Sequence, residues 1–352
     1  MKKIVFVGGG TLGHIYPFLP IVKRIKDKYE LYFIGTTNGL EKQLLDKTEG
    51  FKKRFYLEMQ GFKRSLSLYN LKTIKKYFQC KKKTNQILKE LKPDLVIGMG
   101  GYISGVVLHV CIKRKIKTII HEQNSVMGLA NKLVEKKVNT VLLSFPVTSK
   151  LKNKNVVTVG NPRLSEIYEN HKLFKEEKKL IVIVGGSRGS KQMNEVAIAS
   201  KDKFLQAGYK VILITGKKYY DENKDKIKLV ESQNFEVISF TDKLIDIIKR
   251  ASVVVSRSGA TTLVELMALG KMCILIPSPN VTNNHQEKNA DILVKNECAL
   301  KLLEKDLTVD NLYQAINKLE DNTLRINYKN NMRKLANYNS AYDFIAEVEK
   351  LL

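Results

Sequence analysis

The sequence predicts an α/β protein of two similar doubly wound domains, each with a parallel sheet covered by helices, that face each other across a cleft. Three observations lead to this fold class. Short apolar runs alternate with longer amphipathic segments, as in βα repeats. The series starts again about halfway along the chain, with another strand that runs into a glycine loop. The length of 352 residues suits two domains of about 100–200 residues each.

The first half contains short apolar runs that are expected to be strands, because they are rich in β-branched residues and end at glycine or polar residues. Segments long enough for helices separate them, which predicts a mostly parallel sheet covered on both faces. The expected strands are 3–7, 31–35, 94–98, 118–122 and 140–145.

The second half repeats this pattern. Glycine and proline at 159–163 interrupt any regular element, so we expect one domain at 1–160 and a second at 161–335. The tail at 336–352 is expected to be helical and to pack back toward the N-terminal domain. The expected strands of the second half are 180–189, 210–216, 235–240, 251–259 and 272–277.

The composition limits the chemistry. A formal net charge of +26 attracts anions such as nucleic acid, an anionic membrane surface or phosphorylated substrates. No cysteine pair or Cys/His cluster has metal-ligand spacing, so we expect no bound metal and four buried free thiols in a reducing cytoplasm. No apolar run has the length of a spanning helix, which predicts a soluble or peripheral protein.

The first strand runs into a glycine loop at 8–13 that fits the pattern G-x-G-x-x-G. A dinucleotide site would also need an acid at the end of the second strand to bind the ribose, and none appears before Glu41. A dinucleotide enzyme therefore stays a minor alternative, while the loop still offers backbone N–H groups to a phosphate. Further glycine loops after 94–98 and 180–184 suggest more than one phosphate group in the cleft, although glycine also makes tight turns.

His14 directly follows the first glycine loop, at a helix start that is expected to face the cleft. A neutral imidazole at this place can accept a proton from an acceptor hydroxyl. A lone histidine is also often structural, so the residues alone leave both interpretations open.

Motifs at the expected strand ends follow one another from residue 8 to residue 290. They are GGGTLGHIYP (8–17), GMGGYISG (98–105), HEQNS (121–125), GNPR (160–163), GGSRG (185–189), SRSGATTLVE (256–265) and PSPNVTNNHQEKNA (277–290). Together they resemble the MurG family, the undecaprenyldiphospho-muramoylpentapeptide beta-N-acetylglucosaminyltransferases, over essentially the whole chain.

This resemblance implies the GT-B fold, with a lipid acceptor on the N-terminal domain and UDP-N-acetylglucosamine on the C-terminal domain. It also implies an inverting transfer of N-acetylglucosamine to the 4-hydroxyl of undecaprenyl-pyrophosphoryl-MurNAc-pentapeptide, the step from lipid I to lipid II in peptidoglycan synthesis. UDP-N-acetylglucosamine is then the donor substrate, and no tightly bound cofactor is expected.

The resemblance also implies site residues, with His14 as the candidate general base. The implied UDP-N-acetylglucosamine-binding residues are Thr11, Leu12, Gly13, Asn124, Arg163, Ser187, Thr241, Glu265 and Gln286. The implied acceptor pyrophosphate loops contain Gly10, Gly100, Gly101 and Tyr102.

Three of these residues have structural alternatives or depart from the family. Glu265 would accept hydrogen bonds from both ribose hydroxyls, yet Thr262 and Glu265 also fit a capping box. Arg163 has the planar fork that matches phosphate oxygens, but it could instead form a hinge salt bridge. The family usually has glycine in place of Leu12, so its side chain would crowd the acceptor phosphates or the loop would change conformation, because glycine tolerates positive φ and leucine does not.

Leu71, Ile74 and Phe78 fall on one face of a predicted helix, flanked by lysines that include Lys75 and Lys82. This composition fits an interfacial helix on an anionic leaflet, and a core-facing stripe with solvated lysines is an equal alternative. With the resemblance, it predicts a peripheral protein at the cytoplasmic face of the cell membrane. The anionic membrane surface and other cell-wall synthesis proteins are its candidate partners.

Two other functions remain as alternatives. The first is another UDP-sugar enzyme on the same scaffold, such as a glycolipid synthase or a UDP-N-acetylglucosamine epimerase. The second is a nucleic-acid-binding protein, suggested by the charge alone. The sequence contains no helix-turn-helix, zinc finger or aromatic RNA-binding motif, so no specific nucleic-acid partner is expected.

Overall fold

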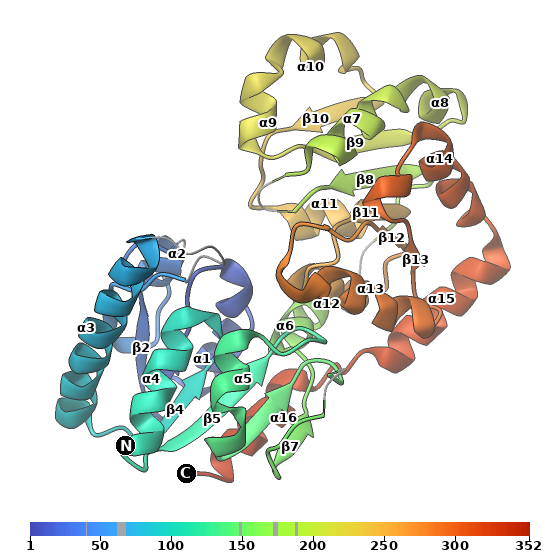
Figure 1. The fold of residues 1–352 in the computed structure, drawn as a ribbon. Coiled ribbons are helices and arrows are strands. Elements are labelled where there is room, and N and C mark those ends of the chain that lie inside the picture. Colours follow the sequence, from blue (N-terminus) through green and yellow to red (C-terminus); the bar gives the residue numbers. More distant parts are fainter. Residues whose placement is uncertain (40, 62–67, 148–149, 172–174, 187–188) are drawn as a thin grey trace. The chain divides into compact units, whose positions relative to one another are not determined.

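The computed structural model describes residues 1–352 except 40, 62–67, 148–149, 172–174 and 187–188. The described chain divides into two compact units (Figure 1). The first unit contains Met1–Glu166 and Asn337–Leu352, and the second contains Ile167–Ala336. The division lies slightly beyond the expected boundary after residue 160, and the last residues of the chain belong to the first unit.

The first unit contains, among its described residues, a seven-stranded sheet in the order β3-β2-β1-β4-β5-β6-β7. All of its neighbouring strands are parallel. The order reverses between β1 and β4, as in doubly wound sheets. The strands are β1 (Lys3–Val7), β2 (Glu30–Thr36), β3 (Phe51–Leu57), β4 (Leu95–Gly98), β5 (Lys117–Glu122), β6 (Thr140–Leu143) and β7 (Val156–Thr158).

Helices cover both faces of this sheet, as Figure 1 shows. Because side chains alternate along β1, Ile4 and Phe6 pack in one core cluster while Val5 and Val7 pack in another. The first cluster also contains side chains of α1 and α16, and the second those of α3 and α4. The helices are α1 (Leu19–Ile25), α2 (Glu41–Asp46), α3 (Leu68–Leu91), α4 (Gly101–Lys113), α5 (Leu129–Val134), α6 (Pro162–Asn170, which runs into the second unit) and α16 (Ser340–Glu349).

The second unit repeats the design with a six-stranded parallel sheet among its described residues, in the order β10-β9-β8-β11-β12-β13. Its strands are β8 (Leu180–Val184), β9 (Lys210–Ile214), β10 (Phe235–Ile238), β11 (Val253–Ser256), β12 (Cys273–Leu275) and β13 (Leu300–Lys301). Its helices are α7 (Lys191–Ala199), α8 (Lys201–Gln206), α9 (Lys217–Glu222), α10 (Lys224–Val230), α11 (Leu244–Arg250), α12 (Ala260–Leu269), α13 (His285–Lys295), α14 (Val309–Lys318) and α15 (Asn322–Leu335).

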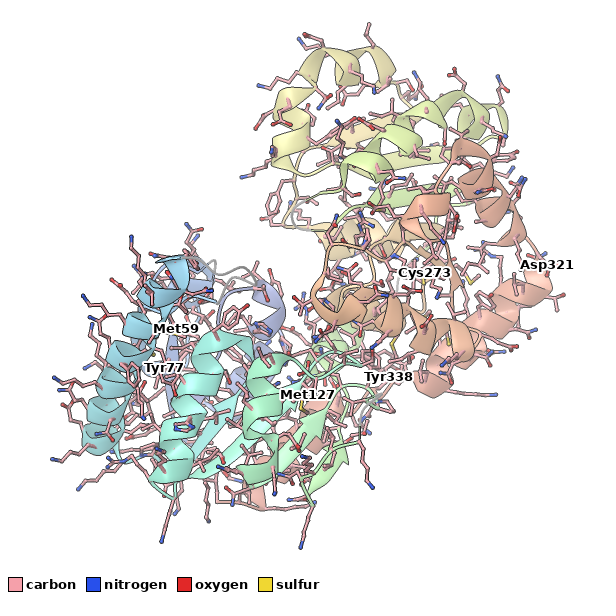
Figure 2. The ribbon with its side chains drawn as sticks, viewed as in Figure 1. Met59, Tyr77, Met127, Cys273, Asp321 and Tyr338 are labelled. Atoms are coloured by element: carbon pink, nitrogen blue, oxygen red, sulfur yellow. The ribbon has the colours of Figure 1, made fainter. Side chains whose placement is uncertain are left out.

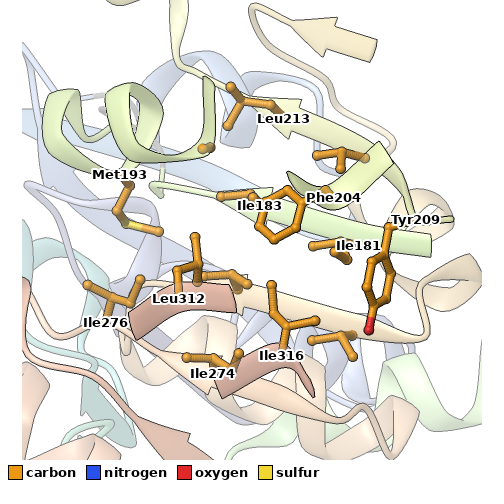
Figure 3. Close-up of a cluster of buried hydrophobic side chains, with 14 of the residues drawn as sticks. Ile181, Ile183, Met193, Phe204, Tyr209, Leu213, Ile274, Ile276, Leu312 and Ile316 are labelled. Atoms are coloured by element: carbon orange, nitrogen blue, oxygen red, sulfur yellow. The ribbon is translucent and has the colours of Figure 1, made fainter. Parts of the chain in front are cut away.

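A hydrophobic cluster joins sheet and helices in the second unit (Figure 3). Ile181 and Ile183 of β8 lie among Phe204 of α8 and Leu312 and Ile316 of α14, all fully or almost fully buried. The prediction of two α/β units with parallel sheets is therefore confirmed.

All four cysteines are free and buried, as predicted. Cys273, labelled in Figure 2, lies in β12 of the second unit and has no exposed surface. Burial raises the pKa of the Cys80 and Cys298 thiols to about 11 and that of Cys111 to about 12. These thiols are protonated at neutral pH and are poor nucleophiles.

Candidate active site

The glycine loops after β1 and β4 meet where the strand order of the first sheet reverses. Val7 at the end of β1 is the register partner of Gly98 at the end of β4, so both loops begin at the same edge. Gly100 and Gly101 have φ values of 109° and 81°. A Cβ on Gly101 would collide with the backbone of Gly9, so only glycine permits this close approach.

His14 lies in the 3-10 turn η1 (Leu12–His14) that follows the first loop. Its Nδ1 is 2.9 Å from the carbonyl oxygen of Gly9 and 3.3 Å from the Thr11 hydroxyl. Because a carbonyl oxygen only accepts hydrogen bonds, Nδ1 carries the proton in the contact with Gly9. The neutral ring then has its lone pair on Nε2, on the side of Gly100, where an added Cβ would lie 2.9 Å from this nitrogen.

Leu12 opens the same turn, followed by Gly13. Leu12 is not among the described residues with positive φ, whereas Gly10 has a φ of 86°. The left-handed backbone that leucine would resist is therefore not required at position 12. The structure brings the predicted residues Gly10, Thr11, Leu12, Gly13, His14, Gly100 and Gly101 to one edge of the first sheet. Tyr102 follows them at the start of α4, with 51% of its surface exposed.

Asn124 follows β5, the strand next to β4. Its backbone N–H and its side-chain amide donate to Oε1 of Glu122 at 3.1 and 3.2 Å. The other carboxylate oxygen of Glu122 accepts from the N–H of Gly128 and the amide of Asn131, both at 2.9 Å. Glu122 thus holds the loop that presents Asn124. Sequence reasoning did not assign Glu122 a role, although an acid at the carboxyl end of a strand was a signal for one.

His121 of β5 is fully buried in the same region. Its Nε2 lies 3.1 Å from the carbonyl oxygen of Gly160 and 3.1 Å from the Ser144 hydroxyl. Burial lowers the pKa of His121 to about 4, despite the opposing hydrogen bond with Gly160. The ring is therefore neutral at pH 7, and we assign it a structural role.

Arg163, near the start of α6, forms a salt bridge, which was the structural alternative to its predicted contact with a phosphate. Its Nη1 lies 2.5 Å from Oε2 of Glu166. The guanidinium also lies over the ring of Tyr16, 5.1 Å from its centroid, which ties Arg163 to the segment after His14. Its contact with a phosphate stays a prediction.

In the second unit, the strand order reverses between β8 and β11. Gly186 and Gly189, in the loop after β8, have φ values of 82° and 72°. Ser187 lies outside the described residues. Arg257 follows β11 and donates from Nη2 to the Ser190 hydroxyl at 2.7 Å.

Arg257 also donates from Nη1 to the carbonyl oxygen of Ile276 at 3.1 Å, and it pairs with Glu304. It therefore connects the loops after β8, β11 and β12. The motif at 256–265 pointed to this segment, but sequence reasoning gave Arg257 no role.

Glu265 lies within α12, and the structure excludes its capping alternative. The helix begins at Ala260 with Gly259 at its N-cap, so Thr262 is inside the helix and cannot cap it. The capping-box interpretation is therefore wrong. Glu265 is 7% exposed on a helix whose other residues are mostly buried.

Gln286 lies in α13 and is bonded to two segments near this helix. Its Oε1 accepts from the backbone N–H of Ser278 at 2.9 Å, and its carbonyl oxygen accepts from the Ser258 hydroxyl at 2.7 Å. Thr241 does not join this group, because it follows β10, which β9 separates from β8. The Thr241 hydroxyl accepts from the N–H of Lys243 at 3.0 Å.

The apolar stripe of α3 faces solvent. Leu71 and Phe78 are each 62% exposed and Ile74 is 44% exposed, while Cys80 and Leu88 fill the buried face of the helix. The core-facing alternative for this stripe is therefore wrong. Lys75 and Lys82 are exposed beside it.

The part of the chain that the structure describes contains neither a helix suited to span a membrane nor a cluster suited to bind a metal. None of the helices in this part of the chain combines the length and apolar character that crossing a bilayer requires. Within the same residues, no three His, Cys, Asp or Glu side chains gather as a metal ligand set.

Comparison with known proteins identifies both halves of the chain. The N-terminal domain of glycosyltransferase family 28 matches residues 4–143, and the C-terminal domain of the same family matches residues 180–348. The first match contains the strands β1 to β6 except Lys3, and leaves out β7, while the second match contains all the strands from β8 to β13.

Relatives and solved structures agree with this match. A UDP-N-acetylglucosamine–N-acetylmuramyl-(pentapeptide) pyrophosphoryl-undecaprenol N-acetylglucosamine transferase of Bacillus pumilus is 40% identical over 94% of both chains. The protein of the same name from Halalkalibacterium halodurans is 39% identical over 90% of both chains.

The crystal structure of Acinetobacter baumannii MurG superposes with a TM-score of 0.79 at 24% identity, covering 99% of this chain and all of that one. A putative UDP-N-acetylglucosamine 2-epimerase from Listeria monocytogenes shares the fold, with a TM-score of 0.73 at 12% identity over 99% of this chain and 96% of that one. The fold alone therefore does not separate transferase from epimerase, whereas the sequence relatives do. By their identity and coverage, this chain belongs to the MurG family of N-acetylglucosaminyltransferases.

Proposed function

We propose that this enzyme transfers N-acetylglucosamine from UDP-N-acetylglucosamine to the 4-hydroxyl of a muramoyl-pentapeptide carried on undecaprenyl pyrophosphate. The names of relatives that match nearly the whole chain support this choice of substrates. The observation that supports the chemistry is His14, whose Nδ1 bonds the Gly9 carbonyl at 2.9 Å and whose Nε2 faces the loop containing Gly100. This tautomer is the one that a base acting through Nε2 requires.

In the proposed reaction, the acceptor oxygen forms a bond to the anomeric carbon of the donor sugar while the bond to the UDP oxygen breaks. The hydroxyl proton passes to Nε2 of His14, and UDP leaves with the electron pair of the broken bond. Backbone N–H groups of the glycine loops are suited to the acceptor pyrophosphate. Glu265 is suited to accept hydrogen bonds from the ribose hydroxyls, and Gln286 to bind the sugar.

We also propose that α3 rests on an anionic membrane surface, which places the enzyme peripherally at the cytoplasmic face where its lipid acceptor would be reached. Exposed apolar side chains beside lysines are typical of helices that lie in the interface. Leu71, Ile74 and Phe78 would enter the headgroup layer, and Lys75 and Lys82 would contact acidic headgroups.

The test is transfer of labelled sugar from UDP-N-acetylglucosamine to a muramoyl-pentapeptide lipid. We expect His14→Ala to lower kcat about 100-fold or more, the usual contribution of a general base. Glu265→Ala should raise the KM for the donor. Thr262→Ala is the matched control in the same helix and should leave this KM unchanged, because Thr262 is given no contact with the donor. Full kcat in His14→Ala would exclude the base, and interconversion of free UDP-sugars without acceptor would favour the epimerase.

A further inference from the structure

A buried acid stands beside the first glycine loop. Glu41, the first residue of α2, has no exposed surface. Its Oε1 accepts from the backbone N–H of Thr36 at 3.1 Å, from that of Gly10 at 3.4 Å, and from the Thr36 hydroxyl. Its Oε2 is buried with no hydrogen-bond partner among the described residues. Burying one oxygen of a carboxylate without a hydrogen-bond partner is costly, so stabilising the fold is a poor explanation for an acid here.

The Gly10 N–H, which donates a hydrogen bond to Glu41, is one end of the peptide unit between Gly9 and Gly10. The other end is the Gly9 carbonyl, which accepts from Nδ1 of His14 at 2.9 Å. Because a peptide unit is planar, fixing the direction of its N–H also fixes the direction of its C=O. Successive hydrogen bonds polarise one another, so the carboxylate makes the Gly9 oxygen a better acceptor for the imidazole N–H.

Glycine at position 9 is a condition for this contact. A Cβ on Gly9 would lie 2.6 Å from Oε1 of Glu41, so any side chain would displace the carboxylate from the loop. The Thr11 hydroxyl lies 3.3 Å from Nδ1 of His14 and is a second, longer partner of the same nitrogen. The shorter contact, to the peptide that Glu41 holds, sets the direction of the ring.

We infer that Glu41 is a positioning residue for His14, acting through the Gly9–Gly10 peptide as a carboxylate–peptide–imidazole relay. The relay keeps the proton on Nδ1 and the lone pair on Nε2, as a carboxylate does when it bonds a catalytic histidine directly. It rests on the proposed function, in which His14 Nε2 takes the acceptor proton. Because Glu41 has no exposed surface, the inference assigns it no contact with either substrate.

The test compares Glu41→Gln with Glu135→Gln. Glu135 is a matched control because it is also a buried carboxylate of the first unit, 6% exposed, that accepts backbone N–H bonds, from Lys152 and Asn153 at 3.1 Å each. We expect Glu41→Gln to lower kcat about 10-fold, the low end for loss of an orienting partner, with the KM for UDP-N-acetylglucosamine within about twofold of wild type. Glu135→Gln should leave both constants unchanged.

The second measurement is the ¹⁵N spectrum of histidine-labelled enzyme, in which the His14 signals are identified by their loss in His14→Gln. Wild type should show a protonated Nδ1 and an unprotonated Nε2 at neutral pH. Glu41→Gln should move both signals toward a mixture of tautomers. Glu41→Asp, which keeps the charge but withdraws it, should move them in the same direction and replaces Glu41→Gln if that variant does not fold.

Unchanged His14 signals and unchanged kcat in the Glu41 variants would overturn the inference. An equal loss of kcat in Glu135→Gln would also overturn it, because the effect would then come from general destabilisation. If the wild-type enzyme transfers no sugar, the proposed function fails, while the ¹⁵N signals still report whether Glu41 controls the tautomer.

Discussion

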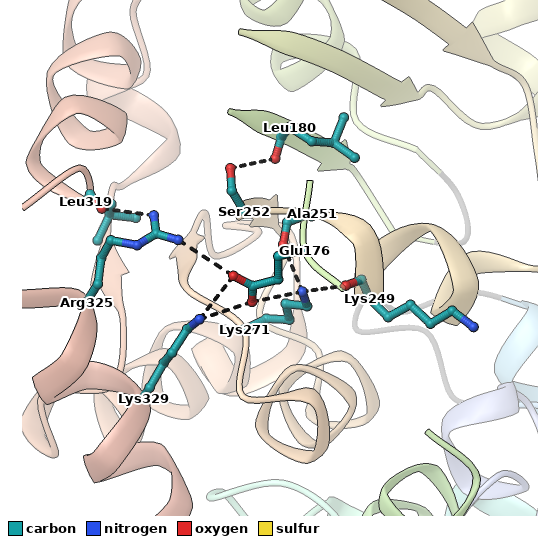
Figure 4. Close-up of polar contacts among 9 residues, drawn as sticks. All are labelled: Glu176, Leu180, Lys249, Ala251, Ser252, Lys271, Leu319, Arg325 and Lys329. Carbon is teal, nitrogen blue, oxygen red and sulfur yellow. Dashed lines mark hydrogen bonds and ion pairs between the residues drawn. The ribbon is translucent and has the colours of Figure 1, made fainter. Parts of the chain in front are cut away.

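At the scale of single residues, Lys271 shows how the second unit accommodates a buried charge. Its side chain has no exposed surface, and Nζ donates to the carbonyl oxygens of Lys249 and Ala251 at 2.6 and 2.8 Å and to Glu176 at 3.1 Å (Figure 4). Glu176 is also paired with Lys329 at 3.0 Å. Burial lowers the pKa of Lys271 to about 8, although Glu176 acts in the opposite direction.

This pKa predicts an unusual dependence of stability on pH. Unfolding returns Lys271 to an ordinary lysine pKa of 10.5, so between about pH 8 and 10.5 the unfolded state binds more protons than the folded state. Relative to Lys271→Met, the free energy of unfolding of wild type should therefore rise across this window, by roughly 2–3 kcal/mol. Urea unfolding of both proteins at several pH values measures this difference. A difference that falls as the pH rises would contradict the prediction.

The residues of the site differ in how far sequence could predict them. Gly10, Gly100 and His14 were predictable, because strands and glycine loops alternate along the chain and parallel strands end at the same edge. Glu41 and Arg257 were not, because their partners depend on contacts between loops that sequence spacing does not specify. Glu41 was noticed only as an acid too far from the second strand to bind a ribose.

At the scale of elements, α3 shows that the spacing of apolar residues along a helix does not tell which surface the apolar face lies against. The spacing of Leu71, Ile74 and Phe78 predicted one apolar face, but a core-facing stripe and a membrane-facing stripe have the same spacing. The structure excludes the core-facing stripe, because Cys80 and Leu88 on the other side of the helix are the side chains that fill the core. Strand β3 was missed for a related reason, since its lysines and arginine break the apolar run that marks a buried strand.

Substitutions on the two faces of α3 should therefore have different effects. Replacing both Ile74 and Phe78 by serine should weaken binding to vesicles that contain anionic lipid while leaving Tm nearly unchanged. Leu88→Ala should lower the free energy of unfolding by about 2–5 kcal/mol, because it opens a cavity in the core. Vesicle sedimentation and thermal unfolding measure the two effects. Loss of folding in the serine variant would contradict the exposed position of this face.

At the scale of the whole molecule, the two ends of the chain belong to one unit. The core of the first unit contains Ala341, Phe344 and Val348 of α16 together with Ile4 and Phe6 of β1. The ring of Phe344 also meets the imidazole of His121, with centroids 5.4 Å apart. Near the surface, Nζ of Lys28 lies 2.6 Å from Oε1 of Glu349, the last residue of α16.

Phe344→Ala should thus destabilise the first unit although the residue lies close to the C-terminus. We expect a loss of about 3–5 kcal/mol, the usual result of removing a fully buried aromatic ring. Hydrogen exchange resolved by segment should show faster exchange in β1 and β5 and unchanged exchange in β8 and β11. Equal acceleration in β8 would contradict the assignment of α16 to the first unit.

The position of α16 has a consequence for synthesis on the ribosome. Translation proceeds at about 5–20 residues per second, and domains usually fold as they emerge. Here the sheet of the first unit emerges early, but residues 337–352 follow only after the whole second unit has been made. Until then, the apolar side chains of β1 and α1 that α16 covers stay open to water. The second unit can thus fold to completion before the first, and the nascent first unit is the part of the chain that a chaperone would bind.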